Sequence, residues 1–355
     1  MARPTIAIVS IGDMGLGVAK LLMANNYRVI TNVADRRLKS QSNHPDPNIY
    51  SQATQDRAQN NSIETISNDL DLCNTADIVL SIVPPRDALA TAQRIAAASQ
   101  HAAFQHKNDI NPLYYLDLNA ISPDSARRIH SLFNDATSAI LSIDGGIIGG
   151  PPHLTSEGTW YKPSIPTSGP HRLPYPSSPG TSEPSLAEVL NIKHIGPTIG
   201  TATGLKMCFA ALTKGMTALA LQSFTTAQNL GVLDELHKHL EMMAPAIGVR
   251  CRKGVVSMVP KAYRWVAEMD EIAATFHSDG GFAEDEAIFT SIARVYQSVA
   301  DDVASSKQSE SSSAEKDAAT ANAHQSSPPL PETVEKVVAM TAKGNETRRA
   351  RAKSI

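Results

Sequence analysis

The sequence predicts an α/β domain with a mainly parallel, doubly wound sheet, followed by an all-helical domain. Up to about residue 150, short apolar runs alternate with helical stretches, which is the pattern of successive βαβ units. From residue 201 onward the pattern changes to one helix after another. A chain of 355 residues is long enough for two domains, and we expect them to span 1–198 and 199–355.

The first strand, 5–11, leads directly into Gly12, Asp13, Met14 and Gly15, and a helix over 16–24 follows. A pyrophosphate group binds at such a turn, because glycines leave the backbone amides of a helix N-terminus open. Ser10 replaces the first glycine of the usual G-x-G-x-x-G pattern. A tight strand-to-helix turn in another kind of α/β protein would use the same two glycines.

The second strand, 28–33, places Asn32 where a dinucleotide-binding domain contacts the adenine ribose. Asp35, Arg36, Arg37 and Lys39 follow it. An arginine at this position favours NADP over NAD, with Arg36 as the contact to the 2′-phosphate, whereas Asp35 leaves NAD open. A solvated loop would account equally well for the two arginines.

The remaining elements follow the same alternation and then change character. We expect strands at 78–83, 114–119 and 139–144, with helices at 86–98 and 123–132. A Pro-, Ser- and Gly-rich insertion at about 151–184 should hold one strand (159–167) and an exposed loop. Helices are expected at 205–230, 233–243, 272–276, 289–304 and 332–340, with a basic tail after the last. The polar, low-complexity insertion at about 305–331 should be disordered.

The helix at 205–230 is apolar nearly all round, which is typical of a helix at a domain centre or a subunit interface. We therefore expect a homodimer formed through the helical domain.

Composition excludes several classes of partner. With 42% hydrophobic residues, 19% charged residues and a net charge of −3, the chain should be globular and bind neither nucleic acid nor membranes. Three widely spaced cysteines indicate a reducing compartment. His237 and His239 are two residues apart on a helix, so a metal site is not expected. The N-terminus lacks the regions of a signal peptide, and we expect a cytoplasmic protein.

Four segments together resemble one superfamily of enzymes. They are I-G-D-M-G at 11–15, S-I-V-P-P at 81–85, D-G-G-I-I-G-G at 144–150 and G-P-T-I-G-T-A-T-G-L-K at 196–206. This set resembles the β-hydroxyacid dehydrogenases, which include 6-phosphogluconate and 3-hydroxyisobutyrate dehydrogenases and, more distantly, imine reductases. The resemblance covers most of the chain outside the two insertions. K-A-Y-R-W at 261–265 and E-M-D-E-I-A at 268–273 resemble a little-characterised, phosphogluconate dehydrogenase-like branch of that superfamily.

The resemblance implies a Rossmann domain joined by a long helix to a helical domain, and hydride transfer between NADP(H) and a small hydroxy or carbonyl substrate, such as a hydroxy acid. It assigns Lys206 as the general acid and base. A lysine suits both roles if desolvation and a helix N-terminus lower its pKa toward neutral pH. Most lysines at helix starts are simply solvated, which is the plain alternative.

The resemblance also assigns binding residues. Val83, Pro84 and Asn119 would contact the cofactor, and Ser122 together with the glycines Gly145 and Gly146 would contact the substrate. Ser122 before a proline is equally typical of a helix N-cap, and the glycines could mark a plain turn.

Two departures from the superfamily pattern concern substrate binding. Ala210 stands where the superfamily usually has an asparagine that holds the substrate. Thr213 and Thr217 lie on roughly the same helical face as Lys206, and either could take the place of that asparagine unless it is a packed interior residue. Glu268 and Met269 stand where many members have a Lys-Asp pair, which suggests a less acidic substrate. An imine reductase and a non-catalytic NADP(H)-binding protein therefore remain alternatives.

Overall fold

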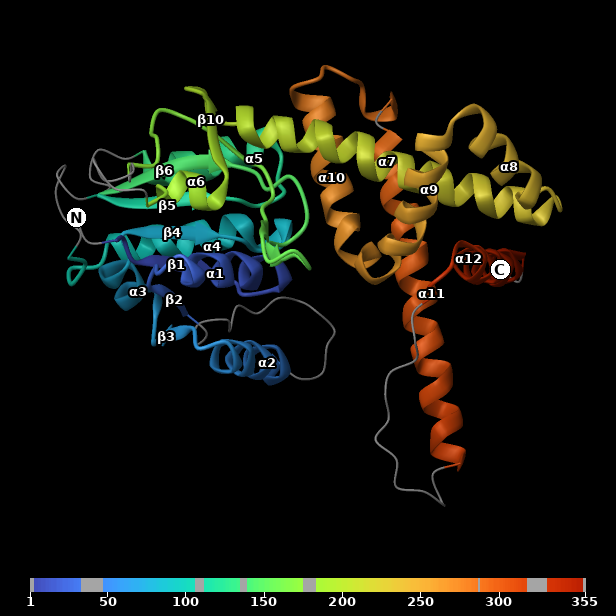
Figure 1. The fold of residues 1–355 in the computed structure, drawn as a ribbon, viewed down its shortest axis with the longest axis horizontal. Coiled ribbons are helices and arrows are strands. Elements are labelled where there is room, and N and C mark those ends of the chain that lie inside the picture. Colours follow the sequence, from blue (N-terminus) through green and yellow to red (C-terminus); the bar gives the residue numbers. More distant parts are fainter. Residues whose placement is uncertain are drawn as a thin grey trace. The chain divides into compact units, whose positions relative to one another are not determined.

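A computed structural model describes residues 3–32, 47–105, 112–134, 139–174, 183–286, 288–317 and 331–353. The chain divides into two compact units, Met1–Met207 and Cys208–Ile355. The division falls within the long helix α7 (Thr201–Asn229). The first unit holds a sheet with its covering helices, and the described residues of the second unit are helical apart from their connections (Figure 1).

The first unit is built on an eight-stranded sheet in the order β10-β9-β6-β5-β4-β1-β2-β3. Neighbouring strands are parallel except for the pair β6 and β9, which is antiparallel. The strands are β1 (Ile6–Val9), β2 (Val29–Asn32), β3 (Glu64–Ile66), β4 (Ile78–Ser81), β5 (Leu113–Asp117), β6 (Ile140–Gly145), β9 (Ile165–Ser168) and β10 (Ile192–Gly196). The predicted mainly parallel, doubly wound sheet is confirmed.

The strand order reverses direction beside β1. The chain runs outward from β1 to β3 and then returns to β4 on the other side of β1. In open α/β sheets, ligands bind in the crevice outside the carboxyl ends of the strands at such a switch point. The carboxyl ends of β1 and β4 are therefore the place where this fold offers a binding site.

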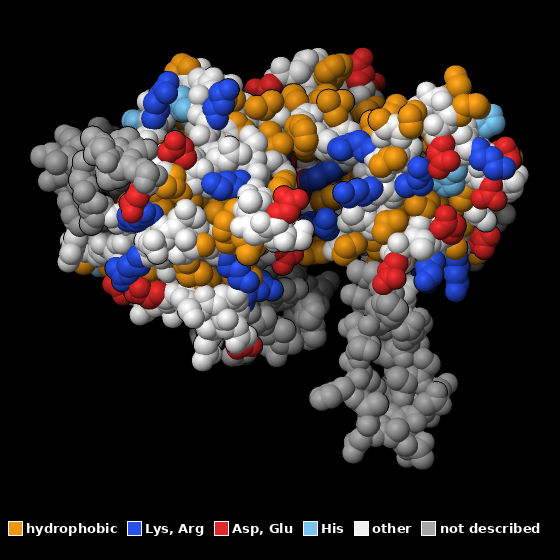
Figure 2. Space-filling model, in the orientation of Figure 1, with side chains coloured by type: hydrophobic (Ala, Val, Ile, Leu, Met, Phe, Trp, Pro, Cys, Tyr) orange, Lys and Arg blue, Asp and Glu red, His pale blue; other side chains and the backbone are white. Residues whose placement is uncertain are grey.

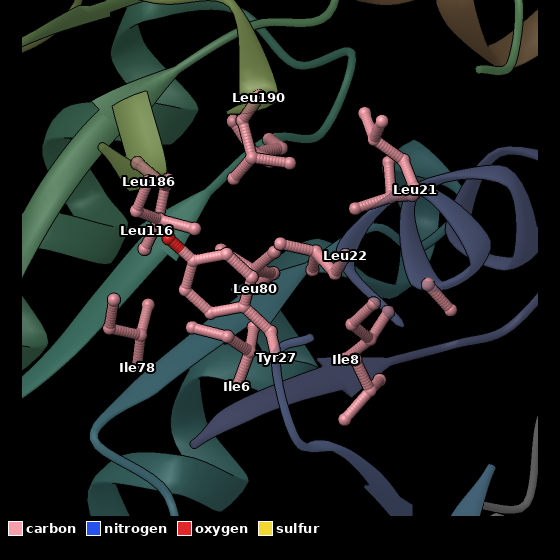
Figure 3. Close-up of a cluster of buried hydrophobic side chains, with 14 of the residues drawn as sticks. Ile6, Ile8, Leu21, Leu22, Tyr27, Ile78, Leu80, Leu116, Leu186 and Leu190 are labelled. Atoms are coloured by element: carbon pink, nitrogen blue, oxygen red, sulfur yellow. The ribbon is translucent and has the colours of Figure 1, made fainter. Parts of the chain in front are cut away.

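Alternating side chains of the strands pack on the two faces of the sheet, because successive residues of a strand point to opposite sides. The helices of this unit are α1 (Asp13–Ala24), α2 (Pro47–Asn60), α3 (Asp69–Thr75), α4 (Pro85–Ser99), α5 (Pro123–Phe133) and α6 (Leu186–Leu190). Ile6 and Ile8 of β1 pack with α1 and α6, in the cluster drawn in Figure 3. Ala7 and Val9 of the same strand pack with α3, α4 and α5.

The second unit consists of helices that pack through aromatic side chains. Its elements after α7 are α8 (Leu233–Met243), α9 (Pro245–Met258), α10 (Ala262–Ser278), α11 (Ile288–Asp317) and α12 (Val334–Lys353), with short 3-10 turns at Val259–Lys261 and Glu284–Glu286. Trp265 and Tyr296 join α10 to α11 with ring centroids 5.2 Å apart. Arg348 of α12 forms two hydrogen bonds with Asp302 of α11, of 2.6 and 3.2 Å.

Helix α11 extends to Asp317, into the low-complexity insertion, and residues 318–330 lie outside the described residues. Disorder of this insertion stays a prediction. Two other expectations about these elements are wrong. The first is the basic tail after residue 340, which continues helix α12.

The expectation of a single strand at 159–167 is wrong as well, because this segment forms two strands. Residues Trp160–Tyr161 form β8, which pairs with β7 (His153–Leu154), and Ile165–Ser168 form β9 in the main sheet. Pro163 lies between them, and a proline cannot donate a ladder hydrogen bond.

Among the residues that the structure describes, no helix has both the length and the apolar character that crossing a bilayer requires.

Candidate active site

The predicted cofactor and substrate residues of the first unit follow the carboxyl ends of neighbouring parallel strands. Gly12 follows β1, Asn32 ends β2, Val83 follows β4 and Asn119 follows β5. Gly145 ends β6, beside β5. The fold therefore brings segments far apart in sequence to one edge of the sheet (Figure 1).

The β1–α1 turn brings strand and helix close together at Gly15 and leaves space beside Gly12. A Cβ on Gly15 would lie 2.1 Å from the Ser10 carbonyl oxygen, so only glycine allows strand and helix to approach this closely. A Cβ on Gly12 would meet nothing within 4 Å, so this position opens on free space. Gly12 caps α1 without a side-chain hydrogen bond, which leaves the first amides of α1 for an anion. Ser10, which replaces the usual glycine, has a φ of 76°.

The end of β2 is hydrogen-bonded to a partly buried ion pair, Arg94–Asp69. The Asn32 side chain donates a 2.9 Å hydrogen bond to Asp69, and the Arg94 guanidinium makes two of 2.8 Å to the same carboxylate. Arg57 of α2 donates to the Ile11 carbonyl at 3.1 Å, which brings a second guanidinium to the β1–α1 turn. Asp35, Arg36, Arg37 and Lys39 lie outside the described residues.

Asn119 links the ends of β4 and β5. Its carbonyl oxygen accepts from the Val83 amide at 2.7 Å, and its amide donates to Ser81 at 3.0 Å. Both polar ends of the side chain are thus bonded to the β4–α4 connection, which holds Val83 and the exposed Pro84 in place. Direct contact between the Asn119 side chain and a cofactor stays a prediction.

Asp117 is a buried carboxyl group beneath this edge. One oxygen accepts the Asn119 backbone amide at 2.9 Å, whereas the other has no hydrogen-bond partner. Burial, followed by the neighbouring charge of Asp144, raises the pKa of Asp117 to about 7.

Lys206 lies against the chain segment that follows β6. Its Nζ donates a hydrogen bond to the Ile147 carbonyl, and a Cβ on Gly146 would lie 2.8 Å from the Lys206 Cβ. Although the whole residue is only partly buried, burial of the amine lowers its pKa to about 8. The solvated lysine that was the plain alternative does not describe this amine.

Ser122 caps α5, as the alternative interpretation predicted. Its hydroxyl accepts from the Ser125 amide at 3.3 Å, and Pro123 follows at the first helical position. Substrate contact by Ser122 or by the backbone of Gly145 and Gly146 stays a prediction. Gly146 itself does more than form a turn, because its missing side chain makes room for Lys206.

Three buried polar residues, Asp144, Ser168 and Thr203, were not predicted to have a role. Asp144 lies next to the last residue of β6 and receives hydrogen bonds from Ser168 of β9, from Gly200 and from Thr203 in the first turn of α7. The signal in the sequence was an aspartate at the end of an apolar strand, directly before two glycines. It gave no indication of which segment would supply the donors.

Known structures share this architecture. A conserved hypothetical protein from Sinorhizobium meliloti matches with a TM-score of 0.54 and 22% identity, over 97% of each chain. The 3-hydroxyisobutyrate dehydrogenase of Mycobacterium tuberculosis matches with a TM-score of 0.56 and 17% identity, over 85% of this chain and 95% of that one. That of Salmonella typhimurium matches with a TM-score of 0.53 and 16% identity, over 95% and 100%. The chain has the fold of the 3-hydroxyisobutyrate dehydrogenases.

One family model matches part of the sequence. Residues 227–299 match the model of a domain of unknown function, DUF1932, and no curated protein sequence matches the chain. This match covers only helices of the second unit, from the end of α7 into α11.

In the second unit, the residues that depart from the dehydrogenase pattern are engaged within the unit itself. The Thr213 hydroxyl donates to the Phe209 carbonyl of its own helix at 3.0 Å. Glu268 of α10 pairs with Lys214 of α7, whose amine lies 5.0 Å from the centre of the Trp265 ring. Substrate contact by Thr213 stays a prediction. Within the described ranges, no group of three or more His, Cys, Asp or Glu side chains is arranged to hold a metal ion.

Proposed function

We propose that the protein is an NADP(H)-dependent oxidoreductase that interconverts a small hydroxy compound, such as a hydroxy acid, and the corresponding carbonyl compound. The observation that carries the proposal is the desolvated Lys206 amine. It lies in the same unit as a β1–α1 turn that is open to a pyrophosphate. The fold shared with 3-hydroxyisobutyrate dehydrogenases supports the same class of reaction.

Each part of the site then has a chemical task. The amides at the start of α1 bind the pyrophosphate, and Gly12 leaves room for it. The nicotinamide ring, when bound, supplies or accepts the hydride. Lys206 accepts the hydroxyl proton when the substrate is oxidised and returns it to the carbonyl oxygen when the substrate is reduced. Gly145 and Gly146 are proposed to contact the substrate at the carboxyl end of β6, although the Gly146 amide itself donates to the Pro166 carbonyl at 3.1 Å.

The choice of NADP over NAD rests on cationic side chains near the end of β2. Arg36 is proposed as the contact to the 2′-phosphate. Arg57 supports the proposal because its guanidinium already lies beside the β1–α1 turn. An Arg36→Ser variant should raise the KM for NADPH several-fold more than the KM for NADH. Tighter binding of NADH than NADPH by the parent protein would contradict this choice.

Initial-rate assays on purified protein test the function. We expect NADP⁺ reduction with one or more 3-hydroxy acids. This activity should be strongly reduced in Lys206→Met, whose NADPH binding, measured by fluorescence titration, should be unchanged. Turnover of cyclic imines with NADPH, but not of hydroxy acids, would replace the proposal with an imine reductase. Binding of NADPH without turnover of either panel would indicate a non-catalytic protein.

We also propose that two copies associate through α7. Phe209, Leu212 and Leu219 lie on one side of that helix and are 46, 75 and 60% exposed. Hydrophobic side chains interrupt the charged surface of the helical unit in Figure 2. Exposed apolar rows of this kind mark interaction sites in soluble proteins.

We propose a cytoplasmic setting as well. All three cysteines are free, which supports it.

A further inference from the structure

Helix α7 has no capping side chain of its own. The residue before its first turn is Gly200, whose φ of +94° and missing side chain place it tightly against Pro123 of α5. A helix leaves its first amide groups without partners inside the helix, and a buried helix end must find acceptors elsewhere. Here the acceptors come from two strands of the sheet.

Asp144 and Ser168 supply those acceptors. The Asp144 carboxylate accepts from the amides of Gly200 and Thr203 at 2.9 and 3.4 Å, and also from the Thr203 hydroxyl. Ser168 of β9 donates to the same carboxylate at 2.7 Å and accepts from the Ala202 amide at 2.9 Å. All three polar side chains, those of Asp144, Ser168 and Thr203, are 4% exposed or less.

The segment that begins with Asp144 also contacts Lys206. Ile147, three residues after Asp144, accepts the hydrogen bond from the lysine amine, and Gly146 packs against the lysine Cβ. Thr203 is three residues before Lys206, so one helical turn joins the residue held by Asp144 to the residue that carries the amine. A rotation or shift of this first turn would move the amine away from Ile147.

We propose that Asp144 is a positioning residue for Lys206: its carboxylate fixes the first turn of α7 on β6 and β9 and thereby sets where the lysine amine lies. The inference rests on the proposed role of Lys206. A carboxylate suits this task because its two oxygens accept from two backbone amides and two hydroxyls at once, whereas an asparagine offers one acceptor oxygen in place of two. Loss of the fixed geometry would let water reach the amine.

Competitive acylation of Lys206, read by mass spectrometry over a range of pH, measures its pKa without any turnover. The titratable groups that interact with Asp144 are Asp117 and His130 of α5, and burial is the cause of the lowered pKa of the parent lysine. In Asp144→Asn we expect the Lys206 pKa to rise toward its ordinary value by at least about half a pH unit. We also expect kcat to fall about tenfold or more, and NADPH affinity to be unchanged.

A second pair of variants keeps the test decisive if Asp144→Asn does not fold. Thr203→Val removes the hydroxyl that donates to Asp144 and keeps the shape, whereas Thr203→Ser keeps the hydroxyl. Thr203→Val should raise the Lys206 pKa, and Thr203→Ser should match the parent. Asp77→Asn is the control for stability alone, because Asp77 accepts the Thr5 amide at the opposite edge of the sheet, at 2.7 Å.

Two outcomes would overturn the inference. One is an unchanged Lys206 pKa in both Asp144→Asn and Thr203→Val, with activity lost only in proportion to the loss of folded protein. The other is a pKa that Asp77→Asn raises as much as these variants do. Since labelling needs no substrate, a parent protein without dehydrogenase activity would contradict the proposed function and leave this measurement intact.

Discussion

A lysine can act as both acid and base near neutral pH only when its surroundings disfavour the ammonium form. At Lys206 that condition is met by burial, and the amine keeps a single hydrogen-bond acceptor in the Ile147 carbonyl. A contribution from the helix N-terminus was expected as well. Burial is the cause of the lowered pKa, and the amides of Gly200 and Ala202 are bonded to Asp144 and Ser168.

The proposed role of Lys206 predicts opposite pH dependences for the two directions of reaction. Oxidation of the alcohol needs the neutral amine, so kcat should rise with pH and level off above a midpoint near 8. Reduction needs the ammonium form, so kcat should fall above the same midpoint. Lys206→Met should lower kcat by about 10²- to 10⁴-fold in both directions. A variant that kept the parent's pH profile would contradict the assignment.

Asp117 predicts a pH-dependent stability. Its pKa is 3.8 in the unfolded chain and about 7 in the folded one, so between these values the folded chain holds a proton that the unfolded chain releases. The contribution of this group is therefore fully present below pH 4 and is lost as the pH rises through 7. Asp117→Asn should lack that loss. In urea titrations, its free energy of unfolding relative to the parent should increase from pH 5 to pH 8.

An equal difference in the free energy of unfolding between Asp117→Asn and the parent at both pH values would show that the Asp117 carboxyl does not carry the proton.

Neither Asp117 nor Asp144 could have been assigned from the sequence. Their surroundings come from β4, β9 and α7, and the donors to Asp144 lie up to 59 residues further along the chain. Lys206, in contrast, could be assigned because the segment before it resembles a known motif.

At the scale of single elements, the two glycines of the β1–α1 turn predict different effects, one on cofactor binding and the other on stability. Gly12→Ala should fold normally, because a Cβ there meets nothing within 4 Å and the φ of −63° suits alanine. It should nevertheless raise the NADPH dissociation constant about tenfold, since the methyl group occupies space meant for the pyrophosphate. Gly15→Ala should instead lower the free energy of unfolding by about 1–3 kcal/mol, through the clash with Ser10.

Thermal unfolding and fluorescence titration of the two glycine variants, side by side, make this comparison. Equal cofactor affinity of Gly12→Ala and the parent would show that the turn does not hold the pyrophosphate. A fully stable Gly15→Ala would show that helix and strand can separate at no cost.

The spacing of apolar residues predicted the bounds of some helices and strands correctly and missed others. Helix α8 spans the predicted residues from Leu233 to Met243. Helix α10 was predicted only over 272–276, although it begins at Ala262, and Trp265 and Met269 extend the apolar spacing of Ile272 toward that start. Helix α9, with its glycines and its basic residues, was not predicted. Short edge strands such as β3 and β10 expose much of their surface and give little alternation.

For the whole molecule, the alternation of strands and helices was enough to predict the architecture of the sheet. The five central parallel strands follow from repeated βαβ units, which join parallel neighbours. The antiparallel pair β6 and β9 could not be foreseen, because the chain between them lies in the Pro- and Ser-rich insertion and carries its own hairpin. Which strands pair within that insertion is decided by tertiary contacts rather than by the local sequence pattern.

Association of two copies is a property of the whole molecule, and the exposed side of α7 predicts how to disrupt it. Replacing Leu212 and Leu219 by glutamate should convert a dimer into a monomer, because it buries two charges in an apolar contact. Gln228→Glu, at an exposed position on the opposite side of the same helix, is the control. Light scattering coupled to size-exclusion chromatography measures the mass. A parent that is monomeric at high concentration would contradict the proposal.

The cap that β6 and β9 provide for α7 bears on how the protein matures. The acceptors and the amides they receive are 34 to 59 residues apart, so the contacts form only after most of the first unit has been synthesised and has closed on itself. An incomplete or misfolded chain would carry an ordinary, protonated lysine at position 206. The lowered pKa of the Lys206 amine thus arises only with the finished tertiary structure of the first unit.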